Sequence, residues 1–332
     1  MMNTSPLLEV NDLGLRLHTH GGMVNAVRGV SFTLRRGETL GLVGESGCGK
    51  SLTAMTIMGL QPEGAVASGS LRFHGEEMIG QSEARWCALR GDRIGMVFQE
   101  PMSALNPVHT VGHQVAEPLR LHRGLNAAAA RKEAVALLDR VGIADAARRF
   151  DAWPHQFSGG QRQRITIAMA LACGPDLLIA DEPTTALDVT IAGQILQLIR
   201  DLVRERSMGL ILISHDLGVI AQNVERMMVM YGGLVVESGP TRDVFTRRAH
   251  PYTQGLFGSR PQLGPQERQP GGQRARLAAI PGNVPELRHM PPGCPFAGRC
   301  SVAMPTCESR MPADTRLAHG HHARCALLES AG

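Results

Sequence analysis

Residues 44–51 of this chain, GESGCGKS, constrain its fold more than any other segment. They follow the short apolar run TLGLV at 39–43 and precede SLTAMTIMGL, so a buried strand is expected to lead directly into a helix. In that context the pattern G-x-x-x-x-G-K-[ST] predicts a phosphate-binding loop. Its glycines let the backbone curl with the N–H groups pointing inward, and the following helix adds its positive N-terminus. The segment therefore predicts an α/β fold that binds phosphate groups.

The lysine of this loop, Lys50, is one of only two lysines among the 34 basic residues of the chain. A lysine fits as a point charge in a tight backbone cradle, whereas arginine is a bulkier planar fork. We expect its ammonium group to contact the β- and γ-phosphates and the Ser51 hydroxyl to contact Mg²⁺. The loop residues expected to bind the nucleotide are Gly44, Glu45, Ser46, Gly47, Cys48, Gly49, Lys50, Ser51 and Leu52.

A second motif, LLIADEP at 177–183, is an apolar run that ends in two acids. Asp181 is suited to coordinate Mg²⁺ through water, and Glu182 is suited to polarise the attacking water. An ordinary acidic strand end is the alternative, and the phosphate loop favours the catalytic interpretation.

The periodicity predicts strands at 7–17, 24–34, 39–43, 177–181 and 210–214, and helices at 189–205 and within 112–150. Strands alternating with helices indicate a largely parallel sheet with helices on its faces. The composition changes after residue 260, where ten of the twenty prolines and four of the seven cysteines lie. This predicts a small, irregular C-terminal module.

Four further segments make a family resemblance specific: FQEP at 98–101, FSGGQRQR at 157–164, ALD at 186–188 and SHD at 214–216. With the two motifs above they resemble, in order, the motifs of ATP-binding-cassette ATPases. The resemblance implies an α/β fold of the ABC type, with a mixed sheet, an antiparallel β subdomain and a helical subdomain at about 100–172. The ATPase domain would span 1–245, and a C-terminal extension with a four-cysteine module would span 246–332.

The same resemblance implies roles for single residues and the cofactors ATP and Mg²⁺. Two nucleotide domains would enclose two ATP molecules, so that each signature segment reaches the ATP held by its partner; an exposed helix start suits this contact with an anion. Glu182 and His215 would be catalytic, and Ser51, Gln99 and Asp181 would hold Mg²⁺. The residues expected at the partner's nucleotide or the dimer interface are Ser158, Gly159, Gly160, Gln161 and Asp188.

The chain departs from the family at the adenine site. Family members stack the base on an aromatic residue upstream of the phosphate loop, but no aromatic residue lies between 1 and 31. Adenine would rest on Leu17, His18 or Val24 instead, and base selectivity is expected to be modest.

The segments MVFQEPMSALNPVHTVGHQVAE, ADEPTTALDVT and HPYTQGLF resemble the subgroup that serves peptide and nickel importers. This implies an ATPase that energises import of di- or oligopeptides with two transmembrane permease subunits, a second ATPase subunit (homologous or a second copy) and an extracytoplasmic substrate-binding protein. Nickel, glutathione or another small solute are alternative cargoes. A cassette protein acting on ribosomes or DNA is a remoter alternative, because the net charge is only +4 and one cassette is present. We expect no nucleic acid partner.

No run approaches the roughly 18 apolar residues of a membrane helix, and the start MMNTSPLLEV does not fit a secretory signal. We therefore expect a peripheral protein at the cytoplasmic face of the inner membrane, held there by the permease subunits.

The tail carries Cys294, Cys300, Cys307 and Cys325 in a proline-rich segment. Four thiolates in such a module suit a metal or cluster that replaces a missing apolar core. The subgroup resemblance implies a [4Fe–4S] cluster, with zinc or free thiols as alternatives. His319, His321 and His322 are possible ligands but are expected to be solvated, and Cys87 and Cys173 are expected to be packing residues.

Overall fold

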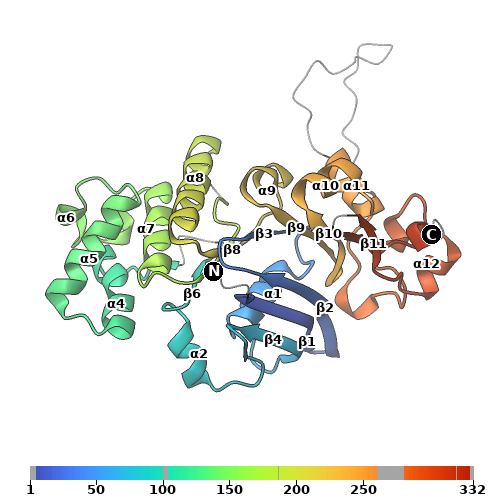
Figure 1. Cartoon of the computed structure of the whole chain (residues 1–332), viewed down its shortest axis with the longest axis horizontal. Helices are drawn as coiled ribbons and strands as arrows, with labels where there is room; N and C mark the ends of the chain where they lie inside the picture. Colours follow the sequence, from blue (N-terminus) through green and yellow to red (C-terminus); the bar gives the residue numbers. More distant parts are fainter. Residues whose placement is uncertain (1–4, 100–103, 186, 260–279, 319, 330–332) are drawn as a thin grey trace, which may run out of the picture.

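The structure is a computed structural model that describes residues 5–99, 104–185, 187–259, 280–318 and 320–329. It contains a four-stranded sheet and an eight-stranded sheet. Figure 1 shows the helices α4 to α7 at one end of the molecule and the C-terminal residues at the opposite end, with both sheets between them. None of the helices in the described part combines the length and apolarity that crossing a bilayer requires.

The larger sheet has the strand order β11-β12-β10-β9-β3-β8-β7-β6. Its central strands pair in parallel and are almost wholly buried, which explains their unbroken apolar sequences. The strands predicted at 39–43 and 177–181 are confirmed, and the sheet is mixed because its remaining pairs are antiparallel. Its strands are β3 (Thr39–Val43), β6 (Ile94–Val97), β7 (Leu177–Asp181), β8 (Gly209–Ile213), β9 (Arg226–Tyr231), β10 (Leu234–Pro240), β11 (Thr315–Ala318) and β12 (His321–Ala323).

The smaller sheet is antiparallel and begins with a long hairpin of β1 (Leu8–Thr19) and β2 (Gly22–Leu34). It is completed by β4 (Val66–Phe73) and β5 (Glu76–Glu77). The inner faces of this sheet, α1 (Lys50–Ile57) and one face of β3, β7 and β8 share one hydrophobic core. The phosphate loop is therefore held between two sheets.

The helical region has a second core, shared with the other face of the large sheet. The helix predicted at 189–205 is confirmed as α8 (Val189–Arg206), whose apolar residues pack on that core. The helical region itself contains α4 (Val111–Arg123), α5 (Ala127–Arg140), α6 (Ala146–Arg149) and α7 (Gly159–Leu171). The remaining helices are α2 (Glu83–Leu89), α9 (Leu217–Asn223), α10 (Thr241–Arg247), α11 (Pro251–Gly258), α12 (Pro305–Ser309) and α13 (Ala326–Glu329), with 3-10 turns η1 (Pro154–Gln156), η2 (Leu287–His289) and η3 (Ala297–Arg299).

The sequence predicts an irregular C-terminal module, but part of this module forms regular strands. The strands β11 and β12 are short, but β12 pairs with β10 at Glu237↔Ala323 and Ser238↔His322. The tail therefore continues the core sheet at its edge. Proline content could not reveal this pairing, because the pairing depends on a partner strand about 85 residues earlier in the chain.

Candidate nucleotide-binding site

The site lies along one edge of the large sheet. The strands β3, β8, β7 and β6 are parallel neighbours, so their carboxyl ends meet at the same edge. Each is followed by a predicted motif, and this edge is where open α/β sheets bind ligands.

The phosphate loop leaves β3 at Val43 with positive φ angles at Gly44, Gly47 and Gly49, of 152°, 78° and 102°. A Cβ at Gly44 would overlap the carbonyl oxygen of Met230, so this position requires glycine. The helix α1 then starts without a side-chain cap on its first turn. Its free N–H groups are available to an anion.

Lys50 is 5% exposed, and its Nζ donates to the carbonyl oxygens of Gly44 at 2.8 Å and Glu45 at 3.0 Å. The ammonium group therefore spans the loop that it was predicted to serve. The Cys48 thiol is 3.7 Å from that Nζ and is 1% exposed. Burial raises its pKa, so Cys48 contributes a neutral side chain packed within the loop.

Ser51 and Asp181 are brought together, as a magnesium site requires. The Ser51 side chain lies close enough to the Asp181 carboxylate to lower its pKa. Burial is the main reason that the pKa of Asp181 is raised; the nearby Glu182 carboxylate raises it further, whereas Ser51 and Lys50 lower it. The Asp181 Oδ1 is buried and has no hydrogen-bond partner. A buried carboxylate oxygen without a partner, beside a hydroxyl, fits a hard divalent cation.

Glu182 is the meeting point of three side chains. Its Oε2 accepts from Gln99 Nε2 at 3.1 Å and from Thr185 Oγ1 at 2.9 Å, and it lies 3.1 Å from His215 Nδ1. Glu182 also has φ of 45°, in the left-handed region that non-glycine residues uncommonly adopt. The structure thus gathers Gln99, Glu182 and His215 and adds Thr185, which the sequence analysis missed although it stands in the same EPTT segment.

The signature residues form a separate group at the start of α7. The Ser158 Oγ accepts from Gln161 N at 3.3 Å, and the Gln161 Oε1 accepts from Ser158 N at 3.1 Å. A Cβ at Gly160 would lie 2.7 Å from Ile191, whose N–H donates to Asp188 at 3.0 Å. Within the described ranges no hydrogen bond joins these residues to the phosphate loop. Gly159 and Asp188 are exposed, so this group faces outward.

Comparison with known proteins agrees with this geometry. Residues 27–185 match the family described as "ABC transporter", and residues 236–307 match "Oligopeptide/dipeptide transporter, C-terminal region". A protein of Brucella abortus (strain 2308), named as a peptide import ATP-binding protein, is 50% identical over 325 residues, which cover 98% of this chain and 96% of that protein. This chain belongs to the ABC transporter ATP-binding proteins.

Other relatives of this ABC protein span its whole length or its core. The dipeptide transport ATP-binding protein of Bacillus subtilis (strain 168) is 48% identical over 325 residues, 97% of this chain and 95% of its own length. An ATP-binding cassette solved as a dimer in a post-hydrolysis state with ADP and Pi has a TM-score of 0.64 and 28% identity, and covers 71% of this chain and 99% of its own. The cbiO1 protein of Clostridium perfringens, part of an ABC transporter complex, has a TM-score of 0.61 at 26% identity, with 73% and 92% covered.

The tail cysteines of this ABC protein line one common cavity between α11 and the tail. Cys294, Cys307 and Cys325 are buried and Cys300 is half-buried. Among the described residues, however, no three His, Cys, Asp or Glu side chains are placed to hold a single metal ion. The family descriptions and relatives' names quoted above mention no metal either. These observations therefore support neither the predicted [4Fe–4S] cluster nor the zinc alternative.

Two expectations about single side chains, one in the tail and one on α2, are wrong. His321 is not solvated: it is 2% exposed, with its Nε2 2.7 Å from the buried Glu237 carboxylate. Cys87 does not pack in the core but is exposed on α2, whereas Cys173 is buried as expected. His322 is half-buried with its Nδ1 3.4 Å from Asp314, and His319 lies outside the described residues.

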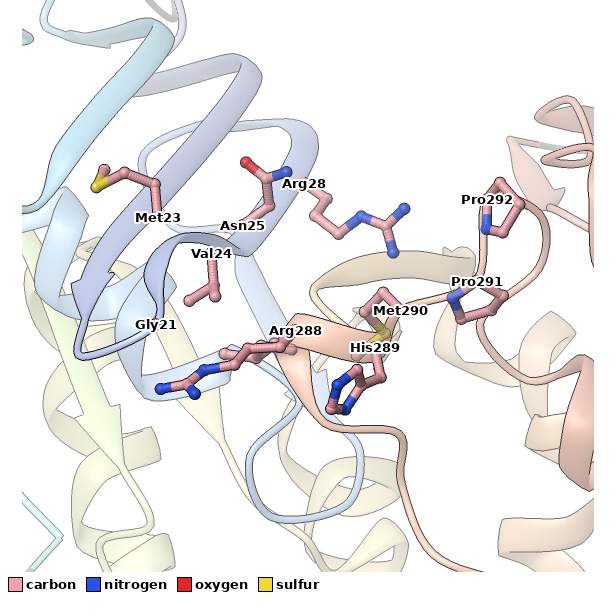
Figure 2. Close-up of a pocket in the computed structure, with 11 residues that line it drawn as sticks. Gly21, Met23, Val24, Asn25, Arg28, Arg288, His289, Met290, Pro291 and Pro292 are labelled. Atoms are coloured by element: carbon pink, nitrogen blue, oxygen red, sulfur yellow. The ribbon is translucent and has the colours of Figure 1, made fainter.

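A cavity of about 580 Å³ lies beside the β1–β2 hairpin, and Figure 2 shows its hairpin wall and its tail wall. Val24 lines it, but Leu17 and His18, the other two residues expected under the base, do not. The Arg28 Nη1 is buried there without a hydrogen-bond partner, and burial lowers the pKa of Arg28. The lining residues are Gly21, Met23, Val24, Asn25, Arg28, Leu287, Arg288, His289, Met290, Pro291 and Pro292.

Proposed function

We propose that this chain binds and hydrolyses ATP to energise import of di- or oligopeptides through a membrane transporter. The observation that carries the catalytic part is the convergence of Gln99, Thr185 and His215 on the Glu182 carboxylate, at the sheet edge that also holds the phosphate loop. We take 1–245 as the ATPase domain and 246–332 as the extension; the two family matches fall on either side of this boundary in the main.

The residues of this chain have distinct tasks in that reaction. The loop amides and Lys50 bind the phosphates, while Ser51, Asp181 and Gln99 hold Mg²⁺, which supplies positive charge to the phosphate oxygens. Glu182 accepts the proton of the attacking water, since its Oε2 is held by three neighbours and is only partly exposed. His215, whose side chain is 65% exposed beside Glu182, would contact the γ-phosphate when ATP is bound.

A second ATPase subunit completes each site. The outward-facing group of Ser158, Gly159, Gly160, Gln161 and Asp188 supports this, because none of these residues serves the phosphate loop of its own chain by a hydrogen bond within the described ranges. Val189, next to Asp188, is 90% exposed in the single chain, and an exposed apolar side chain of this kind suits a surface that a partner covers in the assembly. A homologous subunit and a second copy of this chain are both compatible with that surface.

Two permease subunits are the partners we propose for the helical region. Large apolar side chains are exposed at Phe98, beside Gln99, and at Val108, Leu121 and Trp153 in or beside that region. Contact there would couple Gln99 to the membrane subunits and hold the protein at the cytoplasmic face of the inner membrane. The extracytoplasmic substrate-binding protein would act through the permease.

The peptide cargo rests on the second family match and on the names of the relatives. Uptake of a labelled dipeptide, with labelled nickel in parallel, tests it in cells that carry the wild-type chain or Glu182→Gln. Loss of peptide uptake alone supports the proposal. Loss of nickel uptake alone transfers the cargo to nickel, and unchanged uptake of both refutes both cargoes.

We also propose that the four tail thiols hold a [4Fe–4S] cluster. The four thiols line one cavity, and four cysteine thiolates are the usual ligand set of such a cluster. Backbone N–H groups near three of the sulfurs, those of Phe296, Val302, Leu327 and Leu328, lower the pKa values of these thiols and so favour the thiolate form. Burial nevertheless outweighs these contacts at Cys294, where it raises the pKa to about 11 and keeps the thiol neutral unless a cluster is bound.

Anaerobic purification followed by iron, sulfide and zinc analysis tests the cluster. About four irons and four sulfides per chain are expected. One zinc, or none of these elements, would refute it.

A further inference from the structure

An arginine of the C-terminal extension, Arg299, pairs with a residue of the phosphate loop. Arg299 is the last residue of η3 and immediately precedes Cys300. Its Nη1 lies 2.7 Å from Glu45 Oε2, and its Nη2 lies 3.2 Å from Glu45 Oε1. Glu45 is the second residue of the phosphate loop. Residues 254 positions apart are thus joined by a two-pronged ion pair, the strongest form of this contact.

The pair is built into the structure rather than formed by two loose surface side chains. The side chain of Arg299 is 7% exposed and that of Glu45 is 27% exposed. Arg299 Nη1 also lies 3.2 Å from the Tyr231 hydroxyl, and Arg299 Nε donates to Pro281 O at 2.8 Å. The hydrogen bond from Arg299 to Glu45 is the main reason that the pKa of Arg299 is raised, so the guanidinium stays charged.

The backbone of Glu45 is held from the same side. Its N–H donates to the Tyr252 hydroxyl at 2.8 Å, and Tyr252 lies in α11, outside the phosphate loop and its flanking strand and helix. Tyr252 is fully buried against Tyr231 and Phe296. Both the main chain and the side chain of one loop residue are therefore fixed by residues of the C-terminal part.

Glu45 places a carboxylate in the loop that is proposed to receive a polyphosphate. A carboxylate without a partner would repel the incoming phosphates, and a mobile one could also accept loop N–H groups that the phosphates need. We propose that Arg299 is a positioning residue of the ATP site, which neutralises Glu45 and holds its carboxylate away from the phosphates. The C-terminal module thereby sets the ATP affinity of its own chain; this rests on the proposed binding of ATP at residues 44–52.

The alternative is that Arg299 only anchors the tail, through Pro281 and the ring of Phe296. A mutant cycle on the full-length chain separates the two, with Mg·ATP affinity measured by displacement of a fluorescent ATP analogue. The variants are Arg299→Ala, Arg299→Lys, Glu45→Gln and the double variant Glu45→Gln with Arg299→Ala. The turnover rate at saturating ATP is measured for each.

Arg299→Ala is expected to weaken ATP binding about tenfold to a hundredfold, the range for a partly buried, charge-assisted pair, with a smaller effect on the turnover rate. Arg299→Lys should recover part of the affinity, because it restores the charge without the fork. In the Glu45→Gln background the same alanine substitution should cost less than about threefold. An equal loss in both backgrounds, or no loss in either, would overturn the proposal.

Arg310→Ala is the matched control. It removes an arginine of the same module whose guanidinium pairs with Glu329 in the tail rather than with a residue of the phosphate loop. ATP affinity within twofold of wild type is expected; a loss as large as that of Arg299→Ala would attribute the effect to general damage and overturn the proposal. Failure of the wild-type chain to bind ATP would instead refute the proposed function.

Discussion

The substitution Glu182→Gln tests the catalytic cluster most directly. The amide has the shape of the carboxylate, and its oxygen can occupy the Oε2 position that Gln99, Thr185 and His215 surround. The architecture is therefore retained, but the amide cannot accept a proton from water. Loss of a general base typically lowers the rate by about 10² to 10⁴, which corresponds to about 3–5 kcal/mol on the activation barrier. ATP affinity should change little, since Lys50, Ser51 and Asp181 are untouched.

The assay measures phosphate release at saturating Mg·ATP and, separately, equilibrium ATP binding on the same protein. Glu133→Gln is the matched control, because Glu133 is exposed on α5 and the substitution there removes the same charge. We expect this control to retain its turnover rate. A Glu182→Gln rate within tenfold of wild type, with normal ATP binding, would refute the assignment of Glu182 as the base.

Four further tests concern Mg²⁺ binding at Asp181, packing at two glycines and the choice of nucleotide base. Asp181→Asn should raise the Mg²⁺ concentration needed for half-maximal ATP binding about tenfold or more, because a neutral amide is a poorer ligand for Mg²⁺ than a carboxylate. A Mg²⁺ titration at fixed ATP measures this concentration, and an unchanged value would contradict the prediction. Gly112→Ala should lower the free energy of unfolding by about 2 kcal/mol, because the new Cβ would overlap the ring of Phe150. Gly193→Ala lies within α8, where the new Cβ would have no atom within 4 Å, so it should raise that free energy by about 0.5–1 kcal/mol. Urea unfolding of both variants measures the two changes, and changes of the opposite sign would contradict the reasoning. Because no aromatic residue lies between residues 1 and 31 to stack on adenine, GTP should be turned over at a rate comparable to that of ATP; a strict preference for ATP in a parallel phosphate-release assay would contradict this.

The parts of the fold that were predictable are those whose signal is local. The strand at 177–181 is an uninterrupted apolar run buried on both faces, and its observed bounds match the prediction. The helix α8 differs from its prediction only at its end, by one residue. The phosphate loop was predictable because its glycines and lysine are required within eight residues of one another.

The parts that were not predictable depend on contacts between distant segments. His321 was expected in solvent because the sequence does not show that Glu237, 84 residues earlier, offers it a buried carboxylate. The sequence analysis assigned no role to Thr185, because no motif singles it out. Its contact with Glu182 is visible only in the structure. The pairing of β12 with β10 is likewise set by tertiary packing rather than by the propensity of three residues.

The buried Glu237 explains why the C-terminal extension docks on the core beside the phosphate loop. This residue is 1% exposed, and its carboxylate accepts from Ala249 N at 2.8 Å and from His250 N at 2.9 Å, while His321 approaches it from β12. A carboxylate this deeply buried is tolerated only when such partners surround it, so the segment HPYTQGLF and the tail strand must dock together on β10. That docking places Tyr252 against the Glu45 N–H. The extension therefore continues the core, and its displacement would remove the hydrogen bond between Tyr252 and the phosphate loop.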